Sequence, residues 1–216
     1  MVLAAAVAVG ALGACDPGGA DPPDPPSTTA GGRAGAGSGT ATVPPGLLEC
    51  GKPTDTDKGL MLSELDLSTA TWPMPSGFAE TFLYHEENPV EEVVSTWSAE
   101  PVPAVDVLNI VNVIVYTGLD WGDLADDCGR VPVSAVEERL AGYNSQIGAE
   151  PVSEATMTTV AGQPAIEQQI HLDTYDYHGY WLFSQDQLLH AYCQWTNDET
   201  LIEAGCAELI PSIQVG

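Results

Sequence analysis

Residues 187–213, QLLHAYCQWTNDETLIEAGCAELIPSI, decide the fold class because they join a strand directly to a helix. Residues 187–196 are mostly apolar and follow a short polar turn, which predicts a buried strand that closes a tight hairpin. Residues 198–213 carry apolar side chains at helical spacing. The side chains that share one helical face are Leu201, Ile202, Cys206, Leu209 and Ile213. We therefore expect the chain to end as a strand covered by a helix.

The upstream pattern predicts more strands and one more helix. Residues 105–117 are rich in Val and Ile and predict a buried strand. Residues 133–148 show helical spacing, with Ser134 and Glu137 as a capping box and Gly148 as the stop. Further strands are predicted through Phe82 and Tyr84 and over 153–160, 166–174 and 177–185. This order predicts an α+β fold, in which helices flank an antiparallel β-sheet.

Two segments precede the part of the chain with a globular composition. Residues 1–14 are small and apolar, too short for the roughly 20 residues of a membrane span, and fit the apolar region of an export signal. No basic residue precedes Arg33, which a start codon further upstream would explain. Residues 15–45 are rich in Pro, Gly, Ser and Thr, so we expect a flexible tether. Residues 46–216 contain all five Trp and all seven Tyr and predict one globular domain.

The residues Leu12-Gly13-Ala14-Cys15 resemble a lipobox, the signature of bacterial lipoprotein signal peptides. This resemblance implies that the chain is cut before Cys15 and that the Cys15 thiol is acylated. Two or three acyl chains would anchor the protein stably. The implied location is the extracytoplasmic face of the cell membrane. The alternative is a chance cysteine at the end of an Ala/Gly-rich leader.

The cysteine pattern favours disulfides rather than a metal site. The chain has five cysteines, none of them in a C-x-x-C pair, which disfavours a zinc ribbon. If Cys15 is lipidated, four remain, and four cysteines allow three pairings. We expect the last helix to turn back over its strand, which favours Cys193–Cys206. This choice leaves Cys50–Cys128, which would tie the start of the domain to the acidic loop 118–130.

Three short stretches of the domain resemble the PsbP-like fold, which also occurs in actinobacterial lipoproteins of the LpqN type. They are WPMPSGF at 72–78, VAGQPAIEQQ at 160–169 and AYCQWTNDETLIEAGCAELIPSIQV at 191–215. The resemblance covers residues 71–215. It implies an α/β/α sandwich that serves mainly as a binding and interaction module.

The charge balance narrows the choice of partners. The chain has 31 acidic and five basic residues, for a formal net charge of −26. Nucleic acids carry the same sign of charge, so we expect no nucleic-acid partner. Cations and basic proteins are the partners that this field attracts. An acidic surface that only keeps the protein soluble is the simpler interpretation.

The sequence contains no recognised catalytic, nucleotide or metal signature, so we predict no cofactor and no metal. His171 and His178 would be cross-strand neighbours in a hairpin centred near 174–175, where Asp173 or Asp176 would complete a weak metal site. A Ser184, His178 and Asp186 set is available, as in any chain of this size. The carboxylates of Asp55 and Asp57, and those of Asp120, Asp123, Asp126 and Asp127, match calcium loops poorly.

Aromatic side chains gather on the predicted C-terminal strands: Tyr175, Tyr177, Tyr180, Trp181, Phe183, Tyr192 and Trp195. Alternation places some of them in the core and others outward, where they would form a ligand or partner surface. We therefore expect a non-catalytic binding or scaffold module with a protein or glycolipid partner. The alternatives are a carrier of an apolar or glycolipid ligand and a secreted hydrolase. A large apolar cavity would favour the carrier, and converging His and carboxylates would favour the hydrolase.

Overall fold

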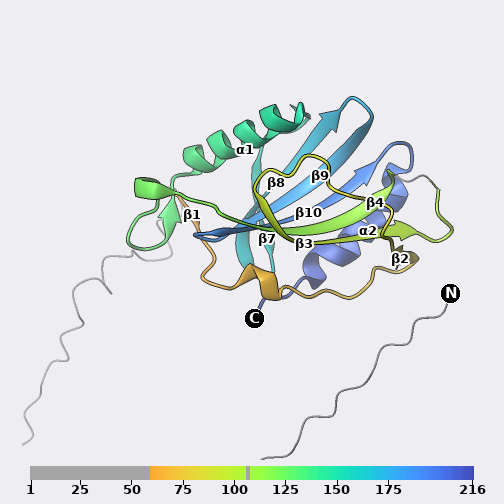
Figure 1. The fold of residues 1–216 in the computed structure, drawn as a ribbon, viewed down its shortest axis with the longest axis horizontal. Coiled ribbons are helices and arrows are strands. Elements are labelled where there is room, and N and C mark those ends of the chain that lie inside the picture. The colour runs from red at the N-terminus through yellow and green to blue at the C-terminus, as the bar shows by residue number, and fades with distance from the viewer. Residues whose placement is uncertain (1–58, 106–107) are drawn as a thin grey trace, which may run out of the picture. The chain divides into compact units, whose positions relative to one another are not determined.

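The computed structural model describes residues 59–105 and 108–216 (Figure 1). The predictions for earlier residues lie outside the described part of the chain: the export signal at 1–14, lipidation of Cys15, the tether at 15–45, Cys50, Asp55 and Asp57. Within the described ranges, no helix has the length and apolar character that crossing a membrane requires.

An antiparallel sheet forms the centre of the described domain (Figure 1). Its strands are β2 (Phe78–Glu80), β3 (Glu92–Pro101), β4 (Ile110–Thr117), β6 (Glu150–Pro151), β7 (Thr156–Val160), β8 (Gln163–Leu172), β9 (Tyr175–Phe183) and β10 (Gln187–Trp195). The strand order is β2-β3-β4-β10-β9-β8-β6, and β7 also pairs with β8. Two short strands, β1 (Leu60–Met61) and β5 (Arg130–Val131), pair separately.

The N-terminal half of the sheet differs from the prediction. The strand expected through Phe82 and Tyr84 is absent, because β2 ends at Glu80 and residues 81–91 cross without regular structure to β3. Strand β3 was not predicted. Residues 92–96 of β3 are exposed, so the strand lacks the continuous apolar run that marks β4 in the sequence. We call residues 81–91 the connecting segment.

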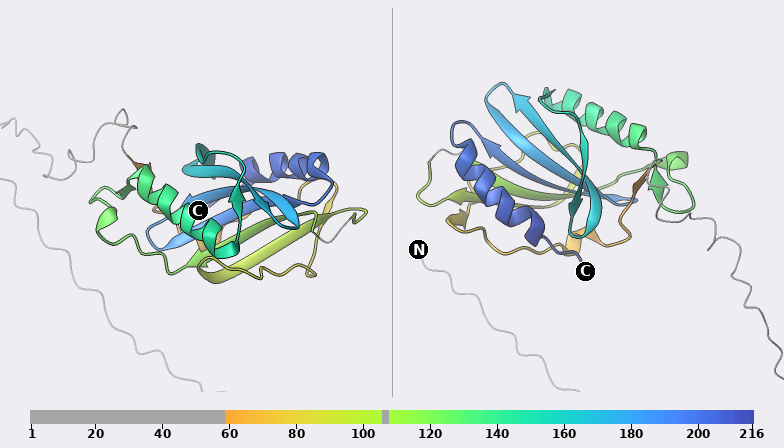
Figure 2. Two further views of the ribbon diagram at one scale, coloured as in Figure 1. Left: turned by 90° about the horizontal axis from the view of Figure 1, so that it is seen from above. Right: turned by 180° about the vertical axis from the view of Figure 1, so that it is seen from behind.

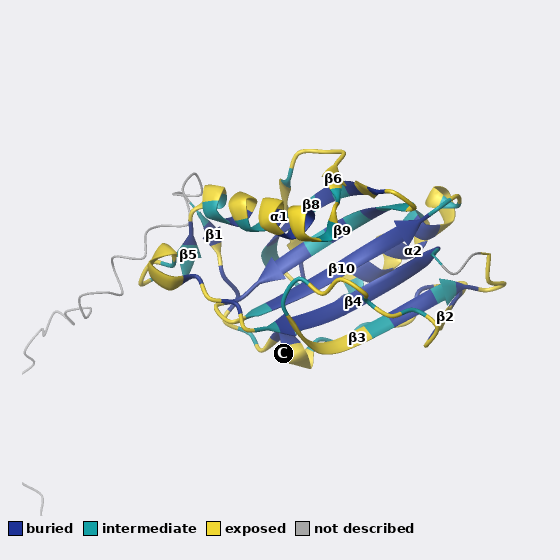
Figure 3. Ribbon diagram, turned by 45° about the horizontal axis from the view of Figure 1, so that its top comes forward, coloured by how far each residue is buried: buried dark blue, intermediate teal, exposed yellow. Residues whose placement is uncertain are grey.

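Two helices cover the sheet, one on each face (Figure 2). Helix α1 (Val133–Ile147) packs Leu140 and Tyr143 with Tyr192, whereas α2 (Glu199–Ser212) packs on the opposite side of β10. Strands β4 and β10 are consequently buried on both faces (Figure 3), as continuous apolar runs require. The predicted α+β class is confirmed.

The ends of α1 test the predicted stop and start signals. Gly148 ends the helix in the left-handed conformation with φ 71°, as predicted, and its N–H bonds the last carbonyls. The capping box is wrong. The helix begins at Val133 after Pro132, so Ser134 lies inside the first turn and makes no cap. Two further single turns are 3-10 helices, η1 (Leu67–Thr69) and η2 (Gly122–Leu124).

The predicted Cys193–Cys206 disulfide is present and ties α2 to β10. The two Cα atoms are 5.9 Å apart, which is the usual spacing of a disulfide. Both cysteines are buried in the apolar cluster between α2 and the sheet. The Cys50–Cys128 pairing stays a prediction, since Cys50 is outside the described residues.

Candidate ligand-binding cleft

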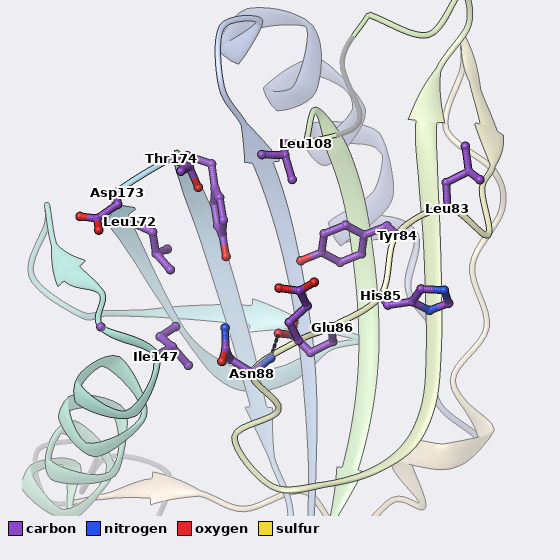
Figure 4. Close-up of a pocket in the computed structure, with 13 residues that line it drawn as sticks. Leu83, Tyr84, His85, Glu86, Asn88, Leu108, Ile147, Leu172, Asp173 and Thr174 are labelled. Carbon is purple, nitrogen blue, oxygen red and sulfur yellow. Dashed lines mark hydrogen bonds between the residues drawn. The ribbon is translucent and has the colours of Figure 1, made fainter.

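An open cleft of about 580 Å³ lies on the α1 face of the sheet (Figure 4). Its walls come from three parts of the chain: the connecting segment, the C-terminal end of α1 and the turn between β8 and β9. The connecting segment contributes Tyr84 and Glu86, which point into the cleft, whereas His85 between them points away from it (Figure 4). Ile147 of α1 and Asp173 of the β8–β9 turn line the other side.

A narrower pocket of about 30 Å³ adjoins the cleft, with which it shares Glu86, Asn88, Ile147 and Tyr175. This volume is enough for one or two water molecules or for one small polar group. Side chains from the sheet line the pocket: Tyr116, Tyr177, Trp181, His190, Tyr192 and Gln194. The predicted outward aromatic surface is thus partly a pocket, because α1 and the connecting segment cover these rings.

Hydrogen bonds to the sheet hold the connecting segment in place. The Tyr192 hydroxyl donates to Glu86 Oε2 over 2.7 Å, and the backbone N–H of Asn88 donates to Glu86 Oε1 over 3.0 Å. The Tyr84 hydroxyl lies 3.1 Å from the Tyr192 hydroxyl and 3.3 Å from Gln194 Oε1. Within the described residues, the half-buried Glu86 carboxylate therefore has only neutral hydrogen-bond partners.

Burial keeps the tyrosines of the cleft in their neutral form. Burial raises the pKa of Tyr84 and Tyr175, and the negative charge of Glu86 raises both further. The pKa of Tyr192 lies well above its usual value, first because of burial and then because of the charges around it. These hydroxyls are therefore available as hydrogen-bond donors at neutral pH.

His190 forms the floor of the narrow pocket. Its ring stacks on Trp181 at 4.7 Å between centroids and 13° between planes, and the Tyr192 ring is also 4.7 Å away. Its exposed fraction is 7%. Burial lowers the pKa of His190 to about 3, so the imidazole is neutral near pH 7. Its Nε2 atom is buried and finds no hydrogen-bond partner within the described residues.

Gly179 explains how the Trp181 ring reaches this position. Residues 177, 179, 181 and 183 of β9 face α1, because successive side chains alternate across a strand. The Trp181 ring lies over Gly179, in space that a Cβ atom would occupy. The missing side chain therefore lets Trp181 lie flat against His190 of the neighbouring strand.

A second set of contacts ties the connecting segment to α1. Glu91 Oε1 accepts hydrogen bonds from Arg139 over 2.9 Å and from the Tyr143 hydroxyl over 2.6 Å. The Arg139 guanidinium also lies 4.3 Å from the centre of the Trp121 ring. Gln146 donates to the Pro89 carbonyl over 3.0 Å. The Arg139 guanidinium thus contacts Glu91 and Trp121, and Arg139 is not among the described residues that line the cleft.

The structure does not assemble the histidine pair that the sequence suggested. The β8–β9 turn consists of Asp173 and Thr174, so His171 faces Asp176 and His178 faces Gln169. His171 Nδ1 lies 2.7 Å from Asp176 Oδ1. The expected turn centre was one residue later, which would have paired the two histidines. Across the described ranges, no group of three or more His, Cys, Asp or Glu is arranged to hold a metal ion.

The residues considered for a catalytic triad lie too far apart, and carboxylates considered for calcium make hydrogen bonds within their own loop. Ser184 lies 3.3 Å from Asp186, but His178 is six residues from Ser184 along β9, or about 20 Å. Asp120 and Asp126 accept hydrogen bonds from the backbone of their own loop. These carboxylates therefore shape the loop that was considered for calcium.

The connecting segment was not predicted from the sequence as part of a site. Tyr84 was assigned to a strand, Glu86 was assigned to no element, and the aromatic residues of β9 and β10 were recognised without the wall that faces them. The available signal was the polar and aromatic sequence YHEEN at 84–88, which has no periodicity and fits a loop that carries function.

No family model matches the chain, and no curated protein matches its sequence. Among solved structures, cyanobacterial PsbP (CyanoP) from Synechocystis sp. PCC 6803 is similar at 11% identity and a TM-score of 0.43, over 74% of this chain and 94% of that one. A protein from Bacteroides thetaiotaomicron VPI-5482 is similar at 12% identity and a TM-score of 0.39. The match covers 74% of this chain, which spans about half (48%) of the Bacteroides protein. The structural neighbours thus include a PsbP protein at low identity.

Proposed function

We propose that this protein is a non-catalytic binding module that a lipid on Cys15 holds at the extracytoplasmic face of the cell membrane. In this proposal the cleft beside Tyr84 and Glu86 takes the ligand. The observation that carries it is the open cleft together with a buried polar atom, His190 Nε2, which lies on the floor of the adjoining pocket and has no partner in the described part of the chain. Buried polar atoms without partners are rare in folded proteins, and a bound ligand is one way to satisfy them.

The chemistry of the cleft supports binding over catalysis. A general base works best when its pKa is near the ambient pH, and the pKa of His190, at about 3, is far below neutral. Tyr84 and Tyr192 have raised pKa values, so neither hydroxyl readily loses its proton. A fixed, neutral, hydrogen-bonding surface is suited to recognition.

The PsbP-like α/β/α sandwich and the kinship to LpqN-type lipoproteins belong to the same proposal. The support for the sandwich is that α1 and α2 pack on opposite faces of one antiparallel sheet. In the proposal, the domain is carried on the tether of residues 15–45 and meets its ligand away from the bilayer.

A carrier of an apolar or glycolipid ligand is a second candidate. Phe82 and Leu83 are exposed by 78% and 75%, and Leu83 lines the cleft. Such exposure of two adjacent large apolar side chains favours contact with an apolar part of a ligand. The cleft itself is open and carries Glu86, Glu87 and Asp173, so this ligand would also need a polar part.

The anchor is tested by replacing Cys15 with Ser in the full-length gene expressed in a bacterium that exports the protein. We expect the unmodified protein in the membrane fraction and the Cys15→Ser protein in the soluble extracytoplasmic fraction, because the hydroxyl is not acylated. Asp16→Asn, which leaves the thiol in place, is the matched control and should stay with the membrane. A Cys15→Ser protein that sediments with the membrane would contradict the anchor.

The cleft is tested by filling it. Ile147→Trp places a large ring where α1 lines both the cleft and the narrow pocket, whereas Glu138→Trp adds the same ring at an exposed position of α1. We expect small molecules that co-purify with the full-length protein under mild extraction, measured by mass spectrometry, to be lost from Ile147→Trp and kept by Glu138→Trp. Equal recovery from both variants would contradict a ligand in this cleft.

A further inference from the structure

We propose that the cleft binds a small organic ammonium ion, which sits between the carboxylate of Glu86 and the rings of Tyr84 and Tyr175. This inference rests on the proposed binding function and adds the chemical class of the ligand. It follows from three features of the described residues: the sign of the charges in the cleft, the aromatic surface beside them and the unpartnered nitrogen below.

The charges that line the cleft are negative. Glu86, Glu87 and Asp173 line it, and no Lys or Arg of the described chain does so. The Arg139 guanidinium is paired with Glu91 and lies over the Trp121 ring. Within residues 59–105 and 108–216, Glu86 bonds only to the neutral Tyr192 hydroxyl and a backbone N–H. A half-buried carboxylate of this kind attracts a cation more strongly than a fully solvated one does.

The surface beside Glu86 is aromatic, which suits a cation with an organic shell. Tyr84, Glu86 and Tyr175 all line the cleft, and the Tyr84 hydroxyl lies 3.1 Å from the Tyr192 hydroxyl that donates to Glu86. A cation that sits at Glu86 would therefore share the cleft with both rings. Aromatic faces attract alkylammonium groups, whereas a bare metal ion needs several oxygen ligands.

The narrow pocket adds a neutral polar contact. His190 Nε2 is buried and has no partner among the described residues, and the imidazole carries no charge near pH 7, so it does not repel a cation above it. The pocket of about 30 Å³ accepts a group the size of a hydroxyl. A ligand with an ammonium group and a short polar arm would fill both parts of the site, with the arm bonded to His190.

The test compares choline with 3,3-dimethylbutan-1-ol, its uncharged analogue of the same shape. Titration calorimetry uses the full-length protein extracted from membranes in a detergent without an ammonium group. We expect choline to bind at least about tenfold more tightly than the alcohol, and added salt to weaken its binding, because the charge contributes to affinity. Ethanolamine, as a primary ammonium ion, tests whether the methyl groups are required.

Matched variants separate the carboxylate of the cleft from the overall charge. Glu86→Gln keeps an acceptor for the Tyr192 hydroxyl and should weaken choline binding by about tenfold or more, the usual effect of losing an interaction with a charged group. Glu138→Gln makes the same change in net charge at an exposed site on α1 and should bind as the unmodified protein does. Thermal unfolding of each variant reports whether it is folded.

The possible results distinguish this inference from the function on which it rests. Equal binding of choline and the alcohol would overturn the ammonium ion and leave the cleft as a binding site. The absence of binding by choline and ethanolamine would also overturn it, whereas the function is judged separately by the Ile147→Trp co-purification. Equal losses in Glu86→Gln and Glu138→Gln would show attraction by net charge alone and would overturn the site at Glu86.

Discussion

At the residue scale, His190 is a polar side chain that aromatic neighbours bury in apolar surroundings. Trp181, Tyr177 and Tyr192 surround its ring, so the energetic cost of removing the imidazole from water is offset only in part. Protonation would add a charge to this buried ring, and burial accordingly lowers its pKa to about 3. Because the pKa of His190 is lower in the folded protein than in the unfolded chain, His190 makes the free energy of unfolding depend on pH.

We predict that His190 weakens the folded state as the pH falls. Between pH 6.5 and about 3, the unfolded chain binds a proton at His190 that the folded protein does not bind, so the free energy of unfolding falls with falling pH. The contribution reaches at most about 1.4 kcal/mol per pH unit. His190→Phe keeps a ring against Trp181 without a titrating group. Urea unfolding from pH 7 to pH 4.5 should show a shallower loss for His190→Phe, and parallel losses would contradict the prediction.

At the element scale, the contact between α2 and the sheet depends on one missing side chain. Gly205 is buried on the inner face of α2, and a Cβ there would lie 2.5 Å from Phe78 Cζ of β2. Helix propensity alone favours alanine over glycine by about 1 kcal/mol. The close approach of β2 therefore decides this position, whereas Gly142 in α1 has open space around it.

Two alanine substitutions should consequently have opposite effects on stability. Gly142→Ala should raise the free energy of unfolding by about 1 kcal/mol, because a helix forms more readily with alanine at an exposed position. Gly205→Ala should lower it by about 1–3 kcal/mol, because the new methyl group displaces the Phe78 ring. Urea unfolding of the oxidised full-length protein measures both. A stabilised Gly205→Ala protein would mean that Phe78 moves without cost.

At the scale of the whole molecule, the dominant property is the net charge of −26. Like charges repel one another in the folded state, which is more compact than the unfolded chain, so repulsion reduces stability. The ionic strength sets the distance over which these charges repel one another. The screening length falls from about 30 Å at 0.01 M to about 10 Å at 0.1 M.

Salt should therefore stabilise this protein. We expect the midpoint of thermal unfolding to rise by a few degrees between 0.01 M and 0.1 M NaCl, because screening removes part of the repulsion. LiCl at the same ionic strength is the control and should give the same rise if screening is the cause. A midpoint that does not move with salt would contradict the expectation, and a rise with one cation alone would indicate specific binding.

Several features of the fold follow from the sequence alone because they depend on neighbours along the chain. Helical spacing over 133–148 and 198–213 located α1 and α2 to within two residues, and Gly148 marked the end of α1. The apolar runs located β4 and β10, and the turn from β10 into α2 brought Cys193 and Cys206 together as predicted. Each of these patterns is short in range, so the sequence by itself determined the α+β class.

Only the tertiary structure decided what meets at the cleft. The β8–β9 turn is centred one residue earlier than expected, and this shift alone separated His171 from His178 and placed His171 opposite Asp176. Glu86 reaches Tyr192 across 106 positions of sequence, through a segment without periodicity. Strand pairing and the packing of α1 bring such residues together. Local spacing holds no information on partners so distant, which is the physical reason that the sequence indicated a binding module without showing where its ligand binds.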